Sequence, residues 1–102
     1  MEYRYRLTER AIDDIRHYYD QIASYSPNLA EKWYGKLFDR FEILRTFPFS
    51  CPLAPGSEKF GEDVRHLVYG KRQSAYRILF VIREDVVIIL SVWRASRGPA
   101  EL

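Results

Sequence analysis

Hydrophobic residues follow two different periods along the chain, and the changes between them predict the order of the elements. In residues 3–7, Tyr3, Tyr5 and Leu7 alternate with arginines, which is the period-two pattern of a half-buried strand. Thr8 follows with a side-chain oxygen suited to a helix N-cap. Apolar residues then recur every three or four positions and predict a helix to about residue 24. The predicted apolar stripe consists of Ala11, Ile12, Ile15, Tyr19, Ile22 and Ala23.

A second helix is predicted directly after the first. Ser26-Pro27 combines a capping side chain with a proline, whose missing N–H costs nothing at a first helical position. The stripe that follows contains Leu29, Ala30, Trp33, Leu37, Phe41 and Leu44, and it ends at Phe47-Pro48. A connection of two or three residues between the helices indicates an antiparallel helical hairpin.

Residues 48–63 contain three prolines and two glycines, so we expect an irregular loop there. Three short strands are predicted after it, near 64–69, 75–83 and 86–93. The expected fold class is therefore α+β: an N-terminal strand, a two-helix hairpin, then a three-stranded antiparallel meander. We expect both helices to pack on one face of an antiparallel sheet. At 102 residues the chain is expected to be one domain, residues 1–102.

The last two strands predict which side chains share a face of the sheet. A two-residue turn at Glu84-Asp85 would pair Arg83 with Val86. In this register, one face carries Tyr76, Ile78, Phe80, Ile82, Val87, Ile89, Ser91 and Trp93, and we expect it to pack on the helices. The opposite face carries Arg77, Leu79, Val81, Arg83, Val86, Ile88, Leu90, Val92 and Arg94. We expect this second face to bind a partner, and the alternative is that the 48–63 loop covers it.

Charge sharpens this expectation. The formal net charge is only +2, but residues 64–97 hold seven bases against two acids, a local charge of about +5. The bases are Arg65, Lys71, Arg72, Arg77, Arg83, Arg94 and Arg97, and the acids are Glu84 and Asp85. Such a segment attracts a polyanion or an acidic partner.

Several other classes of protein do not fit this sequence. No apolar run reaches the roughly 20 residues of a membrane span, and the N-terminus lacks a signal region, so we expect a cytoplasmic protein. Cys51 is the only cysteine, and His17 and His66 are the only histidines, so no metal site and no cofactor are expected. Cys51 has no activating base beside it in sequence, and His17 is expected on the helix surface. His66 adjoins the basic segment and is a candidate general base.

Ordered motifs along nearly the whole chain resemble the RelE/ParE superfamily of bacterial type II toxin–antitoxin modules. They are Y-R-Y-R-L-T-E-R-A at 3–11, F-P-x-S-x-P at 47–52, R-x-L at 65–67, Y-R-I-L-F at 76–80, V-x-I-L-x-V-W at 87–93 and W-R-A-S-R at 93–97. The last motif is similar to the W-H-A-x-R ending of many ParE-like members. The resemblance implies the fold expected above and a toxin neutralised by a cognate antitoxin with an acidic or amphipathic C-terminal segment.

The resemblance also implies one of two activities. ParE-like members inhibit DNA gyrase by binding, whereas RelE-like members cleave mRNA on the ribosome. Arg77 matches the arginine that binds the scissile phosphate in RelE-like enzymes, and Arg65 and Arg94 lie near their other basic residues. The C-terminal residues 98–102 contain no tyrosine or histidine that could act as the base, and arginine is a poor base because it stays protonated. We therefore expect a ParE-like gyrase inhibitor, with the mRNA endonuclease as the alternative.

The residues expected to bind the antitoxin or the target are Arg77, Leu79, Val81, Ile88, Leu90, Arg94, Arg97, Lys71 and Arg72. Under the endonuclease alternative, Arg77, Arg65 and Arg94 would be catalytic. A third reading is a small α+β interaction module unrelated to toxins.

Overall fold

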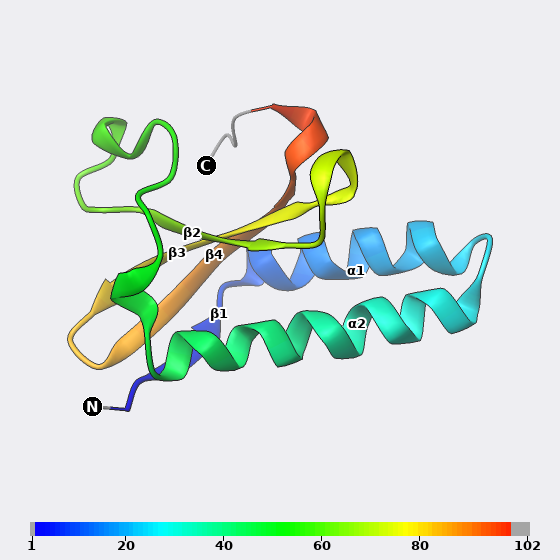
Figure 1. The fold of residues 1–102 in the computed structure, drawn as a ribbon, viewed down its shortest axis with the longest axis horizontal. Coiled ribbons are helices and arrows are strands. Elements are labelled where there is room, and N and C mark those ends of the chain that lie inside the picture. The colour runs from blue at the N-terminus through cyan, green and yellow to red at the C-terminus, as the bar shows by residue number, and fades with distance from the viewer. Residues whose placement is uncertain (1, 99–102) are drawn as a thin grey trace.

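A computed structural model describes residues 2–98 of the chain. Its main elements follow the predicted order (Figure 1). They are β1 (Arg4–Leu7), α1 (Glu9–Ala23), α2 (Pro27–Phe41), β2 (Arg65–Tyr69), β3 (Tyr76–Arg83) and β4 (Val86–Arg94). Short 3-10 turns occupy parts of the connections, including Pro48–Ser50, Ser57–Lys59, Arg72–Ser74 and Ala95–Arg97.

Local capping signals set the start of both helices, as the sequence predicts. The Thr8 hydroxyl accepts the backbone N–H of Ala11 at 3.1 Å, and the Ser26 hydroxyl accepts that of Leu29 at 3.2 Å. Pro27 occupies the first turn of α2. No helix in residues 2–98 is long and apolar enough to cross a membrane.

The four strands form one mixed sheet in the order β1-β4-β3-β2. β2, β3 and β4 are antiparallel neighbours, so the predicted meander is confirmed. The expectation of a wholly antiparallel sheet is wrong, because β1 pairs with β4 in parallel. Both helices, the loop and two strands separate β1 from β4, and this long connection lets β4 run in the same direction as β1.

A bulge in β4 overturns part of the predicted division between the two faces. Arg83 pairs with Val86 as expected, but Phe80 pairs with Ile89 while Leu79 pairs with Ser91. Leu90 has no cross-strand partner, so every later side chain of β4 points to the face opposite to the one predicted. The resulting cross-strand pairs are Tyr76 with Arg94, Arg77 with Trp93 and Ile78 with Val92. Trp93 therefore lies on the second face, whereas Val92 and Arg94 lie on the face toward the helices.

Beyond the end of β1, helix α1 runs along the edge of β4 and contacts its backbone. The Thr8 hydroxyl donates to the carbonyl of the bulge residue Leu90 at 3.0 Å. Asp14 accepts the Val92 N–H at 3.0 Å, and the Tyr18 hydroxyl accepts the Arg94 N–H at 3.1 Å. Side chains of α1 thus pair with backbone groups that an edge strand would otherwise expose.

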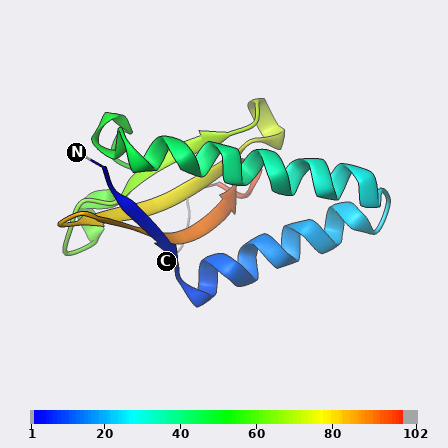
Figure 2. The same ribbon diagram turned by 90° about the horizontal axis from the view of Figure 1, so that it is seen from below.

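Both helices pack against one face of the sheet (Figure 2). The main core contains Ala11, Ile15, Tyr18, Leu37, Phe41, Leu44, Cys51, Leu67, Tyr76, Ile78, Phe80, Val87, Ile89 and Val92. The predicted helix stripes are correct in period but slightly rotated: Tyr18 is buried, whereas Ile12 and Leu29 are 45% and 51% exposed. Tyr5 and Leu7, which alternate with arginines in β1, also pack on this core.

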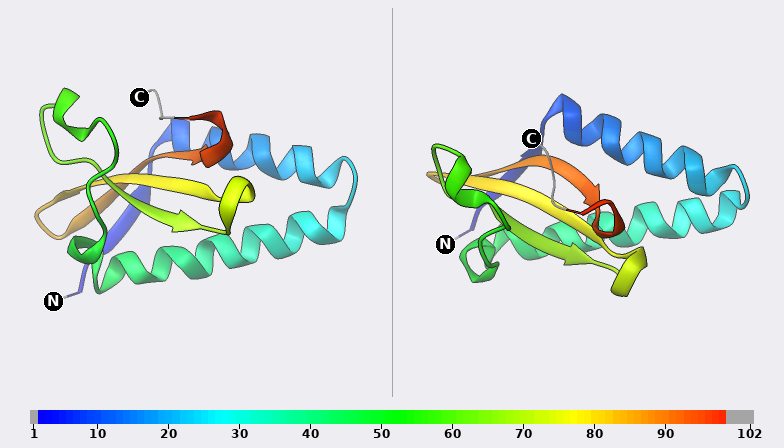
Figure 3. Two further views of the ribbon diagram at one scale, coloured as in Figure 1. Left: turned by 45° about the horizontal axis from the view of Figure 1, so that its top comes forward. Right: turned by 90° about the horizontal axis from the view of Figure 1, so that it is seen from above.

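The 48–63 loop covers the other face (Figure 3). Ala54 and Val64 form a second core with Leu79, Val81, Ile88 and Trp93. The loop also pairs with the outer edge of β2, where the His66 N–H donates to the Pro52 carbonyl at 3.1 Å. The expectation of a bare apolar second face is therefore wrong, because the loop and Trp93 bury its centre.

Candidate functional site

One end of the second face stays open beyond the loop. There Val68, Arg77 and Trp93 form a cross-strand row on β2, β3 and β4. Val68 is 42% exposed. The Arg97 guanidinium lies 4.1 Å from the centroid of the Trp93 ring, a cation–π distance, and the Trp93 indole N–H donates to the Gly98 carbonyl at 2.8 Å. This row and Arg97 form the candidate site, which combines the half-buried Arg77 and the exposed Arg97 with the Trp93 ring, itself only 8% exposed.

Arg77 is the central cation of the row. It is half-buried, and no hydrogen bond or ion pair joins its side chain to another residue of the described chain. His66 lies one row away on the same face, opposite Leu79. Burial lowers the pKa of His66, and the nearby Arg77 charge lowers it further, so the imidazole is held neutral at pH 7. The His66 Nδ1 atom is buried without a partner.

Arg94 and Arg97 converge on Tyr18 of α1, a residue that the sequence pattern did not identify. The Tyr18 hydroxyl accepts the Arg94 backbone N–H and also lies 3.3 Å from an Nη atom of Arg97. The Arg94 side chain extends over the Tyr76 ring, 5.9 Å from its centroid, on the face toward the helices. The bulge at Leu90 is what separates the Arg94 side chain from Arg77.

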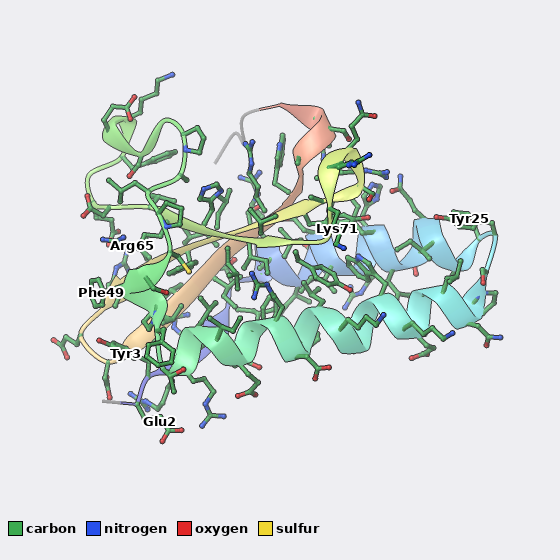
Figure 4. All side chains as sticks on the ribbon, in the orientation of Figure 1. Glu2, Tyr3, Tyr25, Phe49, Arg65 and Lys71 are labelled. Atoms are coloured by element: carbon green, nitrogen blue, oxygen red, sulfur yellow. The ribbon has the colours of Figure 1, made fainter. Side chains whose placement is uncertain are left out.

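Arg65 is engaged by the loop at the other end of β2. Its Nη1 donates to the Cys51 carbonyl at 2.7 Å, and its guanidinium lies 5.3 Å from the Phe49 ring centroid (Figure 4). Burial raises the pKa of the Cys51 thiol, which disfavours a thiolate there. These contacts give Arg65 a role in anchoring the loop.

The three arginines of the endonuclease alternative therefore do not form one cluster. Arg65 pairs with Phe80 and Arg94 pairs with Tyr76, so both occupy the face toward the helices at rows four residues apart. Four residues of strand correspond to roughly 13 Å. Arg77 occupies the opposite face. A phosphorane intermediate needs its cations around one centre, and this arrangement does not provide that centre.

The remaining predicted contact residues divide into exposed and buried sets. Lys71 and Arg72 are exposed in the turn between β2 and β3, where Figure 4 labels Lys71. Leu79, Val81 and Ile88 are buried under the loop, at 2%, 1% and 6% exposure. They can meet a partner only if the loop moves.

Asp14 has an inward role that the sequence pattern did not identify. Its carboxylate accepts the Ser91 hydroxyl at 2.7 Å in addition to the Val92 N–H. Within residues 2–98, no group of three or more histidine, cysteine, aspartate or glutamate side chains could hold a metal ion. The C-terminal residues 99–102, where the sequence offers no base, lie outside the described residues.

Comparison with known proteins extends these findings. Residues 5–99 match a family described as ParE toxin of type II toxin–antitoxin system, parDE. Among solved structures, the chain is similar to one titled "Chromosomal ParDE TA system from P. aeruginosa", with a TM-score of 0.74 and 18% sequence identity. This similarity covers 91% of the present chain and 96% of the other, and at that identity it shows a shared fold. No curated protein matched the sequence.

Proposed function

Because the chain belongs to the family of ParE toxins of type II toxin–antitoxin systems, we propose that it inhibits DNA gyrase by binding and that a cognate antitoxin neutralises it. The observation that carries binding over cleavage is the separation of Arg77 from Arg65 and Arg94 by the sheet. Arg77 and Arg97 form the contact surface for the target, and the buried Trp93 ring supports the Arg97 guanidinium. Arginine is one of the residue types that most often dominate a protein interface.

The antitoxin partner is expected to carry an acidic or amphipathic C-terminal segment. At the open end of the second face, the cations available to it are Arg77 and Arg97, together with Lys71 and Arg72 on the neighbouring turn, whereas Arg94 lies on the face toward the helices. Leu90, which packs on the edge of the second core, supplies an apolar contact. A segment that folds onto this surface would gain specificity from the charges and affinity from the apolar contact. Leu79, Val81 and Ile88 would join it only if the antitoxin displaces the loop. Both interactions would take place in the cytoplasm.

One observation favours the endonuclease alternative. His66 is held neutral beside Arg77, which is the state that a general base needs. Against it, Arg65 and Arg94 lie on the other face of the sheet, so Arg77 is the one arginine of the three that lies on the same face as His66. This alternative therefore stays second.

The experiment compares both activities in one preparation of the full chain. Gyrase supercoiling and mRNA cleavage in stalled ribosomes are measured for the wild type, for Arg77→Ala and for Arg4→Ala. Arg4 is a control arginine, because it is exposed and lies on the edge strand β1, which β4 separates from the Arg77 strand β3. We expect inhibition of supercoiling that falls at least about ten-fold in Arg77→Ala and is unchanged in Arg4→Ala. Ribosomal cleavage that disappears in Arg77→Ala, with supercoiling unaffected, would overturn the proposal.

The partner is tested separately. A short reading frame beside the gene, with a DNA-binding N-terminal half and an acidic tail, should encode a protein that co-purifies with this chain and restores supercoiling. A neighbouring protein that neither binds nor restores supercoiling would refute the proposed antitoxin.

A further inference from the structure

The helical hairpin extends past the end of the sheet (Figure 1). A pocket lies there between the helices and the β2–β3 turn. The pocket has a volume of about 550 Å³. Trp33, Lys32 and Lys36 line it from α2, and Tyr76 and Arg94 line it from the sheet. Because these residues come from segments far apart in the sequence, no local motif marks the pocket.

Two residues that line this pocket each carry a buried hydrogen-bond donor without a partner in residues 2–98. The Trp33 Nε1 and Arg94 Nε atoms are both buried, and neither donates to another group in the described chain. Both side chains lie against the Tyr76 ring, with Trp33 at 5.3 Å between centroids and Arg94 at 5.9 Å. Trp93 provides the contrast, because its indole N–H has an acceptor in the Gly98 carbonyl. Buried donors without acceptors are costly, so an acceptor brought by a ligand would be strongly favoured.

The charge of the pocket selects the ligand. Lys32, Lys36 and Arg94 are lining residues, and among residues 2–98 no aspartate or glutamate lines the pocket. No hydrogen bond or ion pair to another described residue occupies either lysine. Three cations and two free donors thus face one pocket, which makes it complementary to an anion.

The walls of the pocket favour a peptide over a nucleic acid. Trp33 packs edge-to-face on Tyr76, Tyr69 stacks on Tyr76, and Tyr76 is only 7% exposed, so the central ring of the pocket offers no free face to a base. The rim is apolar: Leu29 is 51% exposed and Tyr25, at the tip of the hairpin (Figure 4), is 73% exposed. An aliphatic side chain next to a carboxylate would cover this rim while the carboxylate reaches the cations.

We propose that this pocket binds a carboxylate side chain of an acidic peptide segment, whose neighbouring aliphatic residue packs on Leu29 and Tyr25. The carboxylate accepts from the Trp33 indole and the Arg94 guanidinium, and Lys32 and Lys36 hold it electrostatically. The proposal rests on the proposed antitoxin partnership only for the source of the peptide. It adds a second contact region, on the helix side of the sheet, to the row around Arg77.

The two tryptophans make the test specific. The ¹⁵N-labelled full chain is titrated with a capped eight-residue peptide of alternating glutamate and leucine, and the two indole N–H resonances are followed by NMR. Trp33→Phe assigns the resonances. We expect the Trp33 resonance to move downfield and the Trp93 resonance to stay, because only the Trp33 indole lacks an acceptor. Affinity should fall about ten-fold in Lys36→Gln and in Arg94→Gln, and it should not change in Lys59→Gln, a lysine of the loop.

Several results would overturn the pocket. They are a Trp33 resonance that does not move, equal binding of a glutamine–leucine peptide, no effect of Lys36→Gln, or movement caused by inorganic phosphate or oligo(dT) but not by the acidic peptide. If the antitoxin still binds and neutralises while the peptide leaves Trp33 unmoved, the pocket is refuted and the proposed function stands. If the peptide moves Trp33 but no antitoxin binds, the pocket stands and the partnership fails.

Discussion

Replacing Asp14 with alanine tests how α1 is attached to the edge of β4. One oxygen of the Asp14 carboxylate accepts both the Ser91 hydroxyl at 2.7 Å and the Val92 N–H at 3.0 Å. Ser91 is fully buried, so its hydroxyl would have no acceptor in the variant. Hydrogen bonds to a charged group contribute about 1.5–3 kcal/mol each. Because Asp14 is itself half-buried, we expect the pair to be worth about 2–4 kcal/mol of unfolding free energy.

The assay is urea unfolding of the purified chain, with a thermal melt beside it. For a chain of this length, the expected loss corresponds to a fall in Tm of roughly 10–25 °C. Asp13→Ala is the matched control, because Asp13 is the adjacent carboxylate, is exposed, and lies 3.9 Å from Arg16 in a surface ion pair. It should change stability by less than about 0.5 kcal/mol. Asp14→Asn keeps an acceptor oxygen and should fall between the two. Equal stabilities of Asp13→Ala and Asp14→Ala would refute the reasoning.

Three further predictions concern the helix cap and two titrating groups. Thr8→Ala should lower the unfolding free energy, measured in urea, by about 1–2 kcal/mol, because the cap of α1 and the hydrogen bond to the bulge carbonyl are both lost. Thr8→Ser keeps the hydroxyl and should retain most of this stability, and an equal loss in both variants would contradict the prediction. Burial and the Arg77 charge lower the pKa of His66. The contribution of His66 to stability is therefore present above the unfolded pKa of about 6.5 and is lost as pH falls below that value. The wild type should lose more stability than His66→Gln between about pH 7 and pH 5, and parallel pH profiles of the two would argue against this. The hydrogen bonds from Arg83 lower the pKa of Glu62. Their small stabilisation is present above the unfolded pKa of about 4.3 and is lost as pH falls through the folded value. In Arg83→Gln the Glu62 pKa should return toward its ordinary value, as measured by carboxyl NMR, and an unchanged titration would exclude this cause.

The candidate site was only partly predictable. Arg77 and Arg97 lie at the open end of the second face. The alternation of side chains along β3 and the direction in which the chain leaves β4 both predict this position. Arg94 does not join them, because one unpaired residue in β4 reverses the side chains that follow it. No feature of β4 alone predicts that residue. The bulge is held by a hydroxyl on α1, 82 positions away in the sequence.

Local physics explains what the sequence determined by itself. The N-cap hydroxyls of Thr8 and Ser26, the proline at Pro27 and the two hydrophobic periods act over a few residues, so they specify the elements and their order. The motifs spread along the chain likewise indicated the toxin family, to which residues 5–99 belong.

Only the tertiary structure decided which surfaces are open. Whether the second face is bare depends on where the 48–63 loop lies, and whether β4 has a free edge depends on α1. The pocket beside Trp33 exists because the two helices extend past the end of the sheet and lie next to the β2–β3 turn from the other half of the chain. These outcomes depend on contacts between segments that are distant in sequence. Such contacts stabilise the protein only when the whole chain packs, so local sequence patterns do not predict them.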